Sequence, residues 1–238
     1  MFGAIRNWWF DGRRRKLAGL FAFEFAVVML GVLAAQGLAD WAEDRGAQRR
    51  LDVALERIRR DAGYNMAAAE AWQKSSPCLD QRMALVMRAA SAGAPLAETD
   101  LRRPTIRFNY FEPLSEGDDL LLRQRGDERL ADTIQQFDSS VDVMAERLRQ
   151  IADQWAAFQL LDPVNGPVLR EDRVVARHNA SAIRAHLRGV DVGSASIVRF
   201  GEALGADPVY DPGERLPRDC SEIWSSGRTM IVDGRNGR

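Results

Sequence analysis

Two histidines are the side chains of this chain with the clearest potential to bind a metal or transfer a proton. His178 and His186 are eight positions apart in a segment with helical periodicity, which places them about 80° apart around a helix axis. Histidines that share a metal ion on one helix are normally three or four positions apart. We therefore expect two surface imidazoles, with no metal site and no bound cofactor.

The paired carboxylates do not form a catalytic arrangement either. Asp118-Asp119 and Glu171-Asp172 are adjacent in the sequence, so the side chains of each pair diverge on a helix. A general acid and a general base must instead converge on one substrate. We expect solvated charges, or acidic residues in the first turns of helices. The sequence also lacks the motifs of serine nucleophiles, phosphate loops and dinucleotide sites.

The chain has two cysteines, Cys78 and Cys220. Neither has the nearby cysteine or histidine that a zinc site needs. In an oxidising compartment a distant pair of this kind predicts a disulfide. Such a bond closes a loop of about 140 residues, for which the chain-entropy model gives roughly 4–5 kcal/mol as an upper figure. Two buried free thiols are the alternative.

Arginines form the one conspicuous cluster of like charge. Five of them occupy one predicted helix: Arg170, Arg173, Arg177, Arg184 and Arg188. An anionic ligand or a partner protein is one use for such a helix face. A solvated face whose charges pair with local carboxylates is the alternative. Over the whole chain 33 basic residues are interleaved with 34 acidic ones, which argues against a nucleic-acid partner because such proteins carry a basic stripe.

The elements that position these residues begin with an apolar run, Leu17 to Ala39, which follows the basic cluster 13–16. The run has about the 20 residues that a helix needs to cross a bilayer, and it contains no proline. It therefore predicts a transmembrane helix. The alternative is a cleaved signal peptide, with the small residues Gly37 and Ala39 before the cleavage site. Glu24 lies inside the run, which is unusual for a signal peptide.

The orientation of the span depends on more than a count of arginines, since basic residues follow the run as well as precede it. The contiguous cluster 13–16 adjoins one end, whereas the other end opens with Asp40, Glu43 and Asp44. Long C-terminal domains are also translocated largely regardless of charge. We expect residues 40–238 to lie outside the cytoplasm. In the opposite orientation the arginines after the span would be a patch for anionic lipids.

Glu24 shares a helix face with Gly31 and Ala35. A small residue at every fourth position lets two helices approach closely, and a carboxylate at that depth is costly unless it has a partner. We expect this face to pack against another membrane protein or a second copy of the chain. A protonated or snorkelling glutamate on a lone anchor is the alternative.

Helical periodicity dominates the remainder of the chain. The strongest stripe alternates steps of four and three and predicts a helix over about 127–161: Leu130, Ile134, Phe137, Val141, Met144, Leu148, Ile151, Trp155 and Phe158. We expect this stripe to form the core of a bundle, and a coiled coil between chains is the alternative. Further helices are predicted over about 49–72, from Pro77 onward, over 167–190 and over 194–204.

A strand is expected where the periodicity changes. Residues 105–111 alternate between apolar and polar side chains and lie between prolines. Residues 229–232 are the best partner, so we expect a minor two-stranded β ribbon. The predicted fold is therefore mainly α: a cytoplasmic basic tail (1–16), a transmembrane helix (17–39) and an antiparallel helical bundle (40–238).

The membrane segment resembles a known group of proteins. The stretch from Glu24 to Ala34, with the exit Trp41-Ala42-Glu43-Asp44-Arg45, is similar to uncharacterised bacterial single-span proteins of the inner membrane. The resemblance covers about residues 15–60. It implies a bacterial inner-membrane protein with an uncleaved span, and it implies no biochemical activity.

These features predict a non-catalytic membrane protein that presents a periplasmic helical domain for protein–protein interaction, such as an accessory subunit of a membrane complex. Its expected partners are the bilayer and another membrane protein or a second copy. The first alternative is a sensory domain that binds a small ligand near the arginines and signals through a partner span. The cytoplasmic tail is too short to form an output module, which favours the interaction role. An envelope enzyme is the third possibility.

Overall fold

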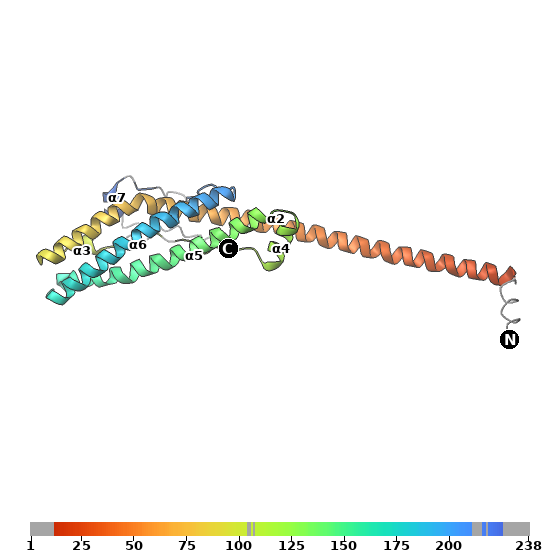
Figure 1. Ribbon diagram of the computed structural model, residues 1–238, viewed down its shortest axis with the longest axis horizontal. Coiled ribbons are helices and arrows are strands. Elements are labelled where there is room, and N and C mark those ends of the chain that lie inside the picture. The colour runs from red at the N-terminus through yellow and green to blue at the C-terminus, as the bar shows by residue number, and fades with distance from the viewer. Residues whose placement is uncertain (1–11, 104–105, 107, 211–215, 218, 226–238) are drawn as a thin grey trace. The chain divides into compact units, whose positions relative to one another are not determined.

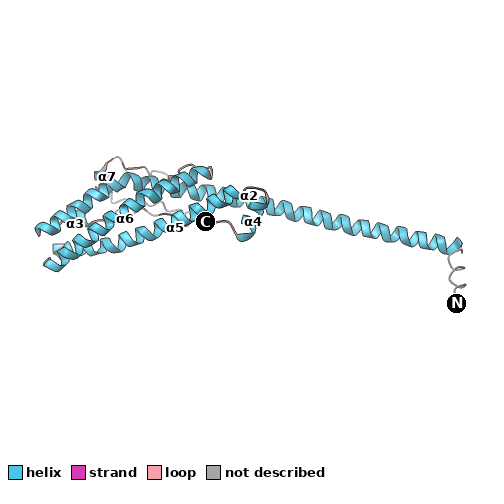
Figure 2. Ribbon diagram, viewed as in Figure 1, coloured by secondary structure: helices cyan, strands magenta, loops and turns pink. Residues whose placement is uncertain are grey.

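The computed structural model describes residues 12–103, 106, 108–210, 216–217 and 219–225, without the side chains of 12–18, 98, 221 and 225. The described chain is helical and contains no strand (Figure 2). It forms two compact units, Met1–Asp52 and Val53–Arg238. Most of the predicted basic tail, residues 1–11, lies outside the described residues.

Helix α2 (Gly12–Ala92) includes the apolar run and the first part of the bundle. The prediction that a new helix begins at Pro77 is wrong, because Pro77 lies inside α2. Proline has no N–H, so the carbonyl of Gln73 loses its helical hydrogen bond. Trp72 and Leu79 on either side are buried. Their burial holds both halves of the helix against the bundle, which explains why α2 continues through the proline.

Two long helices complete the bundle, and shorter ones connect them (Figure 1). The remaining elements are α3 (Glu98–Leu101), α4 (Glu116–Gln124), α5 (Glu128–Ala156), the 3-10 helices η1 (Ala157–Leu161) and η2 (Pro163–Asn165), α6 (Arg170–Ala203) and α7 (Cys220–Ser225). Asp162 caps η2 by accepting a hydrogen bond from Val164 N, and Gly166 adopts a φ of 133° before α6. This turn reverses the chain, so α5 and α6 are antiparallel.

Side-chain contacts show the direction of the third long helix. Met66 of α2 packs against Gly201 of α6, and Asp80, further along α2, pairs with Arg184, earlier in α6. Helices α2 and α6 are therefore antiparallel, which means that α2 and α5 run in the same direction. The bundle predicted from the sequence is present, with two antiparallel helix pairs and one parallel pair.

The heptad-like stripe of α5 and η1 lies in the core of this bundle. Seven of its nine predicted positions are buried: Ile134, Phe137, Val141, Met144, Ile151, Trp155 and Phe158. Phe137 also contacts Phe111, with ring centroids 4.8 Å apart. The stripe is thus used within the chain, as expected for an amphipathic helix that buries one face.

Helix α6 is longer than predicted. The sequence suggested a helix ending near Val190 and a second beginning at Ser194, but α6 is continuous through Gly193. A Cβ at Gly193 would overlap the Sδ atom of Met144, and one at Gly201 would overlap that of Met66. These glycines let neighbouring helices approach closely, so they are packing positions rather than helix ends.

The strand predicted for 105–111 is not confirmed by the residues that are described. Ile106 and residues 108–111 have irregular backbone, and Tyr110 is exposed whereas Phe111 is buried. Asn109 donates its backbone N–H to the buried Asn65 side chain at 2.8 Å. This segment therefore lies along helix α2 and finds its hydrogen bonds there. The expected partner strand, 229–232, lies outside the described residues.

Candidate functional site

Two arginines of the predicted cluster, Arg184 and Arg188, line a groove between α2 and α6. The groove has a volume of about 520 Å³ and is lined by Gln73, Ser76, Pro77, Asp80, Arg184, Leu187, Arg188 and Asp191. Helix α2 reaches it at the proline described above, and α6 presents one charged residue on each successive turn. A groove near the arginines was expected for a ligand-binding domain.

The charges in this groove cancel one another. Arg184 donates two hydrogen bonds to Asp80, from Nε at 2.6 Å and from Nη2 at 2.9 Å. These hydrogen bonds raise the pKa of Arg184. Arg188 remains exposed, but Asp191 lines the same groove. Two arginines and two aspartates make the site electrically balanced, so it does not attract an anion strongly.

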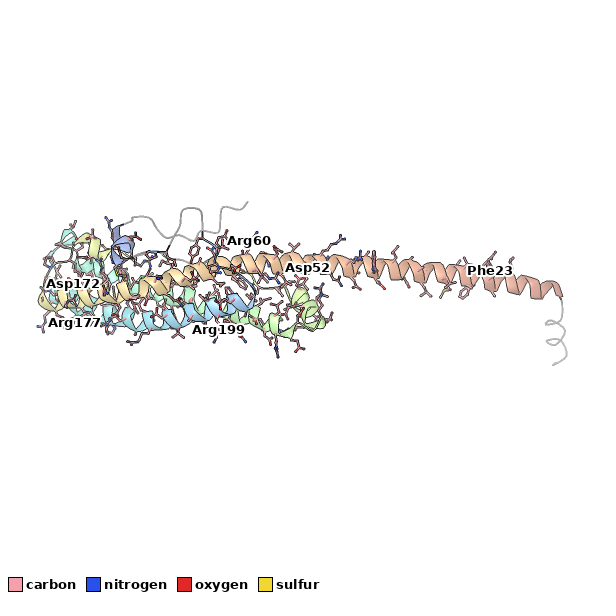
Figure 3. The ribbon with its side chains drawn as sticks, turned by 90° about the horizontal axis from the view of Figure 1, so that it is seen from above. Phe23, Asp52, Arg60, Asp172, Arg177 and Arg199 are labelled. Atoms are coloured by element: carbon pink, nitrogen blue, oxygen red, sulfur yellow. A yellow bond between two sulfur atoms is a disulfide. The ribbon has the colours of Figure 1, made fainter. Side chains whose placement is uncertain are left out.

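The other arginines of the predicted cluster do not converge on this groove. Arg173 donates a hydrogen bond to the carbonyl of Val168 at 3.3 Å, and its guanidinium packs against Gly93. Arg170 and Arg177 are exposed, and neither has an ion-pair partner among the described residues. Arg177 lies at the same end of the bundle as Asp172 (Figure 3). Of the predicted cluster, Arg184 thus forms an ion pair, and Arg173 contacts the end of α2.

The histidines and acidic pairs have separate surroundings. His186 Nε2 lies 3.3 Å from Gln154 Nε2 of α5, whereas His178 is exposed. Within the described residues no group of three or more histidine, cysteine or acidic side chains is placed to hold a metal ion. Both acidic pairs lie in the first turn of a helix, α4 and α6 respectively. Asp172 accepts the backbone N–H of Leu169 at 2.8 Å, as a capping residue does.

The cysteines lie together in the structure as a disulfide pair. Cys78 on α2 and Cys220 on α7 have Cα atoms 5.4 Å apart, although 142 positions separate them in the sequence. Helix α7 is thereby joined to α2 at the residue that directly follows Pro77.

The residues that Trp224 contacts beside the disulfide were not predicted. The guanidinium of Arg82 lies over the ring of Trp224, 4.2 Å from its centroid, and the rings of Trp224 and Trp155 are 6.5 Å apart. Arg82 also pairs with Asp100. Burial lowers the pKa of Arg82, and Asp100 opposes that effect. The sequence carried one hint, a tryptophan four positions after Cys220, but nothing that linked it to Arg82.

A second attachment holds the chain after α6 against α2. Val209 donates its N–H to the carbonyl of Gly63 at 3.0 Å, and a Cβ at Gly63 would overlap the carbonyl oxygen of Asp207. Tyr210 donates a hydrogen bond to Glu70. Burial raises the pKa of Tyr210, and this hydrogen bond raises it further. Gly63 is therefore required by a close approach of backbone to backbone.

The apolar run differs from all of these sites, because every described side chain from 19 to 38 is exposed. It is long and apolar enough to cross a membrane, and its most apolar stretch of 18 residues has no buried residue. Glu24 and Ala35 are exposed, and the Cβ position of Gly31 has no atom within 4 Å. Packing of this face against a partner remains a prediction.

No protein-family model, no curated protein and no solved structure matches this chain.

Proposed function

We propose that this chain is a non-catalytic, single-span protein of the bacterial inner membrane that presents its helical bundle in the periplasm for contact with another protein. The observation that carries the proposal is the exposed apolar surface of residues 19–38. A helix that is apolar on all sides needs cover from a protein core or from lipid. The lipid bilayer is the cover that suits its length.

The proposed orientation has two supports. The basic cluster 13–16 adjoins one end of the run, and the acidic residues Asp40 and Asp44 follow the other. The disulfide pair Cys78 and Cys220 suits an oxidising compartment, such as the periplasm. The resemblance of the anchor region to single-span inner-membrane proteins supports an uncleaved span.

An interaction role is supported by the way in which the polar residues are used. Arg184 is neutralised by Asp80, and Asp119 is paired with Arg123 at 2.8 Å. The bundle buries its own apolar stripe. We infer that the protein acts as an accessory subunit that contacts its partner through the bundle surface and through the membrane face of Glu24, Gly31 and Ala35.

A sensory domain is the second candidate, and the α2–α6 groove is the observation that favours it. A ligand for an open groove with balanced charge would itself carry both charges or none. Its signal would pass to a partner span through the face of Glu24.

Reporter fusions at Arg238 test the topology. We expect activity from a reporter that works only in the periplasm and none from a reporter that works only in the cytoplasm. The reverse pattern would overturn the proposed orientation and place the domain in the cytoplasm.

Affinity purification in a mild detergent, followed by mass spectrometry, tests the interaction role. A partner should co-purify with the full chain, and Glu24→Ala combined with Gly31→Leu should reduce its recovery. Ala26→Leu is the matched control, because it adds the same side chain on the opposite face of the helix. Equal recovery from the double variant and the control would contradict a role for the Glu24 face.

A further inference from the structure

We infer that the Cys78–Cys220 bond is a redox-sensitive attachment of α7 to the bundle. Reduction of this bond releases α7 and exposes Arg82 and Trp155, while the bundle stays folded. The inference deepens the proposed function and rests on it, since an oxidising compartment is where the bond would form. It assigns a means of regulating one surface of the interaction domain.

The bundle does not need α7 for its core. The buried apolar side chains belong mainly to α2, α5, η1 and α6, with a few from the connecting segments. In α7 the described side chains are all partly exposed: Cys220, Glu222, Ile223 and Trp224. Removing α7 would therefore uncover part of the bundle surface without opening a cavity in its interior.

The uncovered surface would have a distinct chemistry. Trp224 now lies over the guanidinium of Arg82 and beside the indole of Trp155. With α7 in place, 10% of the Arg82 side chain is exposed, and Trp155 is 3% exposed. When Trp224 leaves, a cation and an aromatic ring become available next to each other. Such a surface suits another aromatic side chain, because Trp224 already shows that the pair binds one.

The two cysteine residues differ in exposure, which favours one of them as the point of attack by a reductant. Cys78 is buried, whereas Cys220 is partly exposed. A dithiol would attack with one thiolate at Cys220 Sγ. A bond forms between these sulfurs, the Cys78–Cys220 bond breaks, and Cys78 Sγ takes the electron pair and then a proton. The second thiolate of the dithiol closes on the first, leaves as a cyclic disulfide and frees the Cys220 thiol, so two electrons pass to the protein.

Hydrogen–deuterium exchange of the full chain in mild detergent tests the release. After treatment with dithiothreitol, we expect amide exchange in 219–225 to rise at least tenfold, with exchange in α5 and α6 unchanged. The variant Cys78→Ser with Cys220→Ser should behave like the reduced chain without any reductant, and dithiothreitol should not change it further. Unchanged exchange in 219–225 would overturn the proposal, and so would an equal rise in α5 and α6.

One further variant and one chemical modification separate the disulfide from the aromatic contact. Trp224→Ala in the oxidised chain should raise amide exchange in 219–225 less than reduction does. A larger rise would contradict the proposal, because the indole and not the disulfide would then be the main attachment of α7. Arginine modification by a dicarbonyl reagent should increase severalfold at Arg82 in the double serine variant, and equal modification would contradict exposure. Because these measurements use purified protein, a failure of the reporter-fusion test would leave them unaffected.

Discussion

The apolar run and helix α5 carry similar side chains in opposite surroundings. Phe25 in the run is 59% exposed, whereas Phe137 in α5 is fully buried. In α5 the apolar residues return every three or four positions and polar residues fill the opposite face, so one face can be buried by two neighbouring helices. The run has no polar face. Its burial therefore cannot come from one neighbour, and among the described residues nothing covers it.

Glycines repeat the same contrast. Gly63 in the bundle meets the chain after α6 so closely that an added Cβ would lie 2.8 Å from Val209 Cγ2. Gly31 in the run has open space around its Cβ position. Gly63 is required by a contact within the chain, whereas no described atom lies within 4 Å of the Cβ position of Gly31.

Removing the buried ring should produce the largest effect. Phe137→Ala should destabilise the bundle by about 3–5 kcal/mol, because a buried ring is lost and a cavity is left. The measurement is urea unfolding of the full chain in mild detergent, followed by circular dichroism. Phe25→Ala is the matched control and should leave the bundle transition unchanged. Equal shifts from the two variants would break the distinction between the two regions.

Filling a glycine should have a smaller effect. Gly63→Ala should destabilise the bundle by about 1–3 kcal/mol, since the new methyl group must displace the backbone at Asp207. This outcome reverses the usual gain when alanine replaces glycine in a helix. Gly31→Ala should leave bundle unfolding unchanged. A stabilising effect of Gly63→Ala would show that the chain after α6 is not held against α2.

The smallest effect concerns a carboxylate of α2. Burial raises the pKa of Asp61, although Arg60 and Arg57 partly oppose it. Because the folded-state pKa exceeds the ordinary value of 3.8, the stability that protonated Asp61 contributes is present below pH 3.8 and is lost as the pH rises through the raised pKa.

Asp61→Asn should therefore give a small increase in the urea midpoint at pH 7, and this increase should shrink as the pH approaches 3.8. Glu56→Gln, at an exposed position on the same helix, serves as the control and should show no such trend. A gain that is independent of pH would mean that burial of the charge at Asp61 is not its cause.

The long helices could be predicted because their cause is local. The stripe on α5 was placed to within a few residues, since a period of three and four positions already specifies which face is buried. Pro77 and Gly193 were misjudged for the opposite reason. Each residue is a helix breaker by local propensity, but contacts with distant segments override that propensity. The alternation at 105–111 gave no sign of the hydrogen bond from Asn109 N to Asn65, because Asn65 lies far away in the sequence on α2.

Among the candidate sites, too, one contact could be predicted from the sequence and others could not. The cysteine pairing could be proposed, because a chain with two cysteines allows a single intramolecular pairing. The neutralisation of Arg184 by Asp80 could not, since 104 positions separate the two residues. Nor could the contact between Arg82 and Trp224, which depends on where α7 lies along α2. Charge in the sequence shows which residues can pair, and proximity in the fold decides which ones do.

The sequence by itself determined the regions of this protein: an apolar helix long enough to span a bilayer, amphipathic helices for a bundle, and two cysteines able to join distant segments. These properties follow from composition and period, which are local. Only the tertiary structure decided that α2 and α5 run in the same direction, that Gly63 and Gly201 are contact points, and that Trp224 covers Arg82. Those features depend on which segments of the chain contact one another, and periodicity and composition do not specify contacts between segments that are far apart in the sequence.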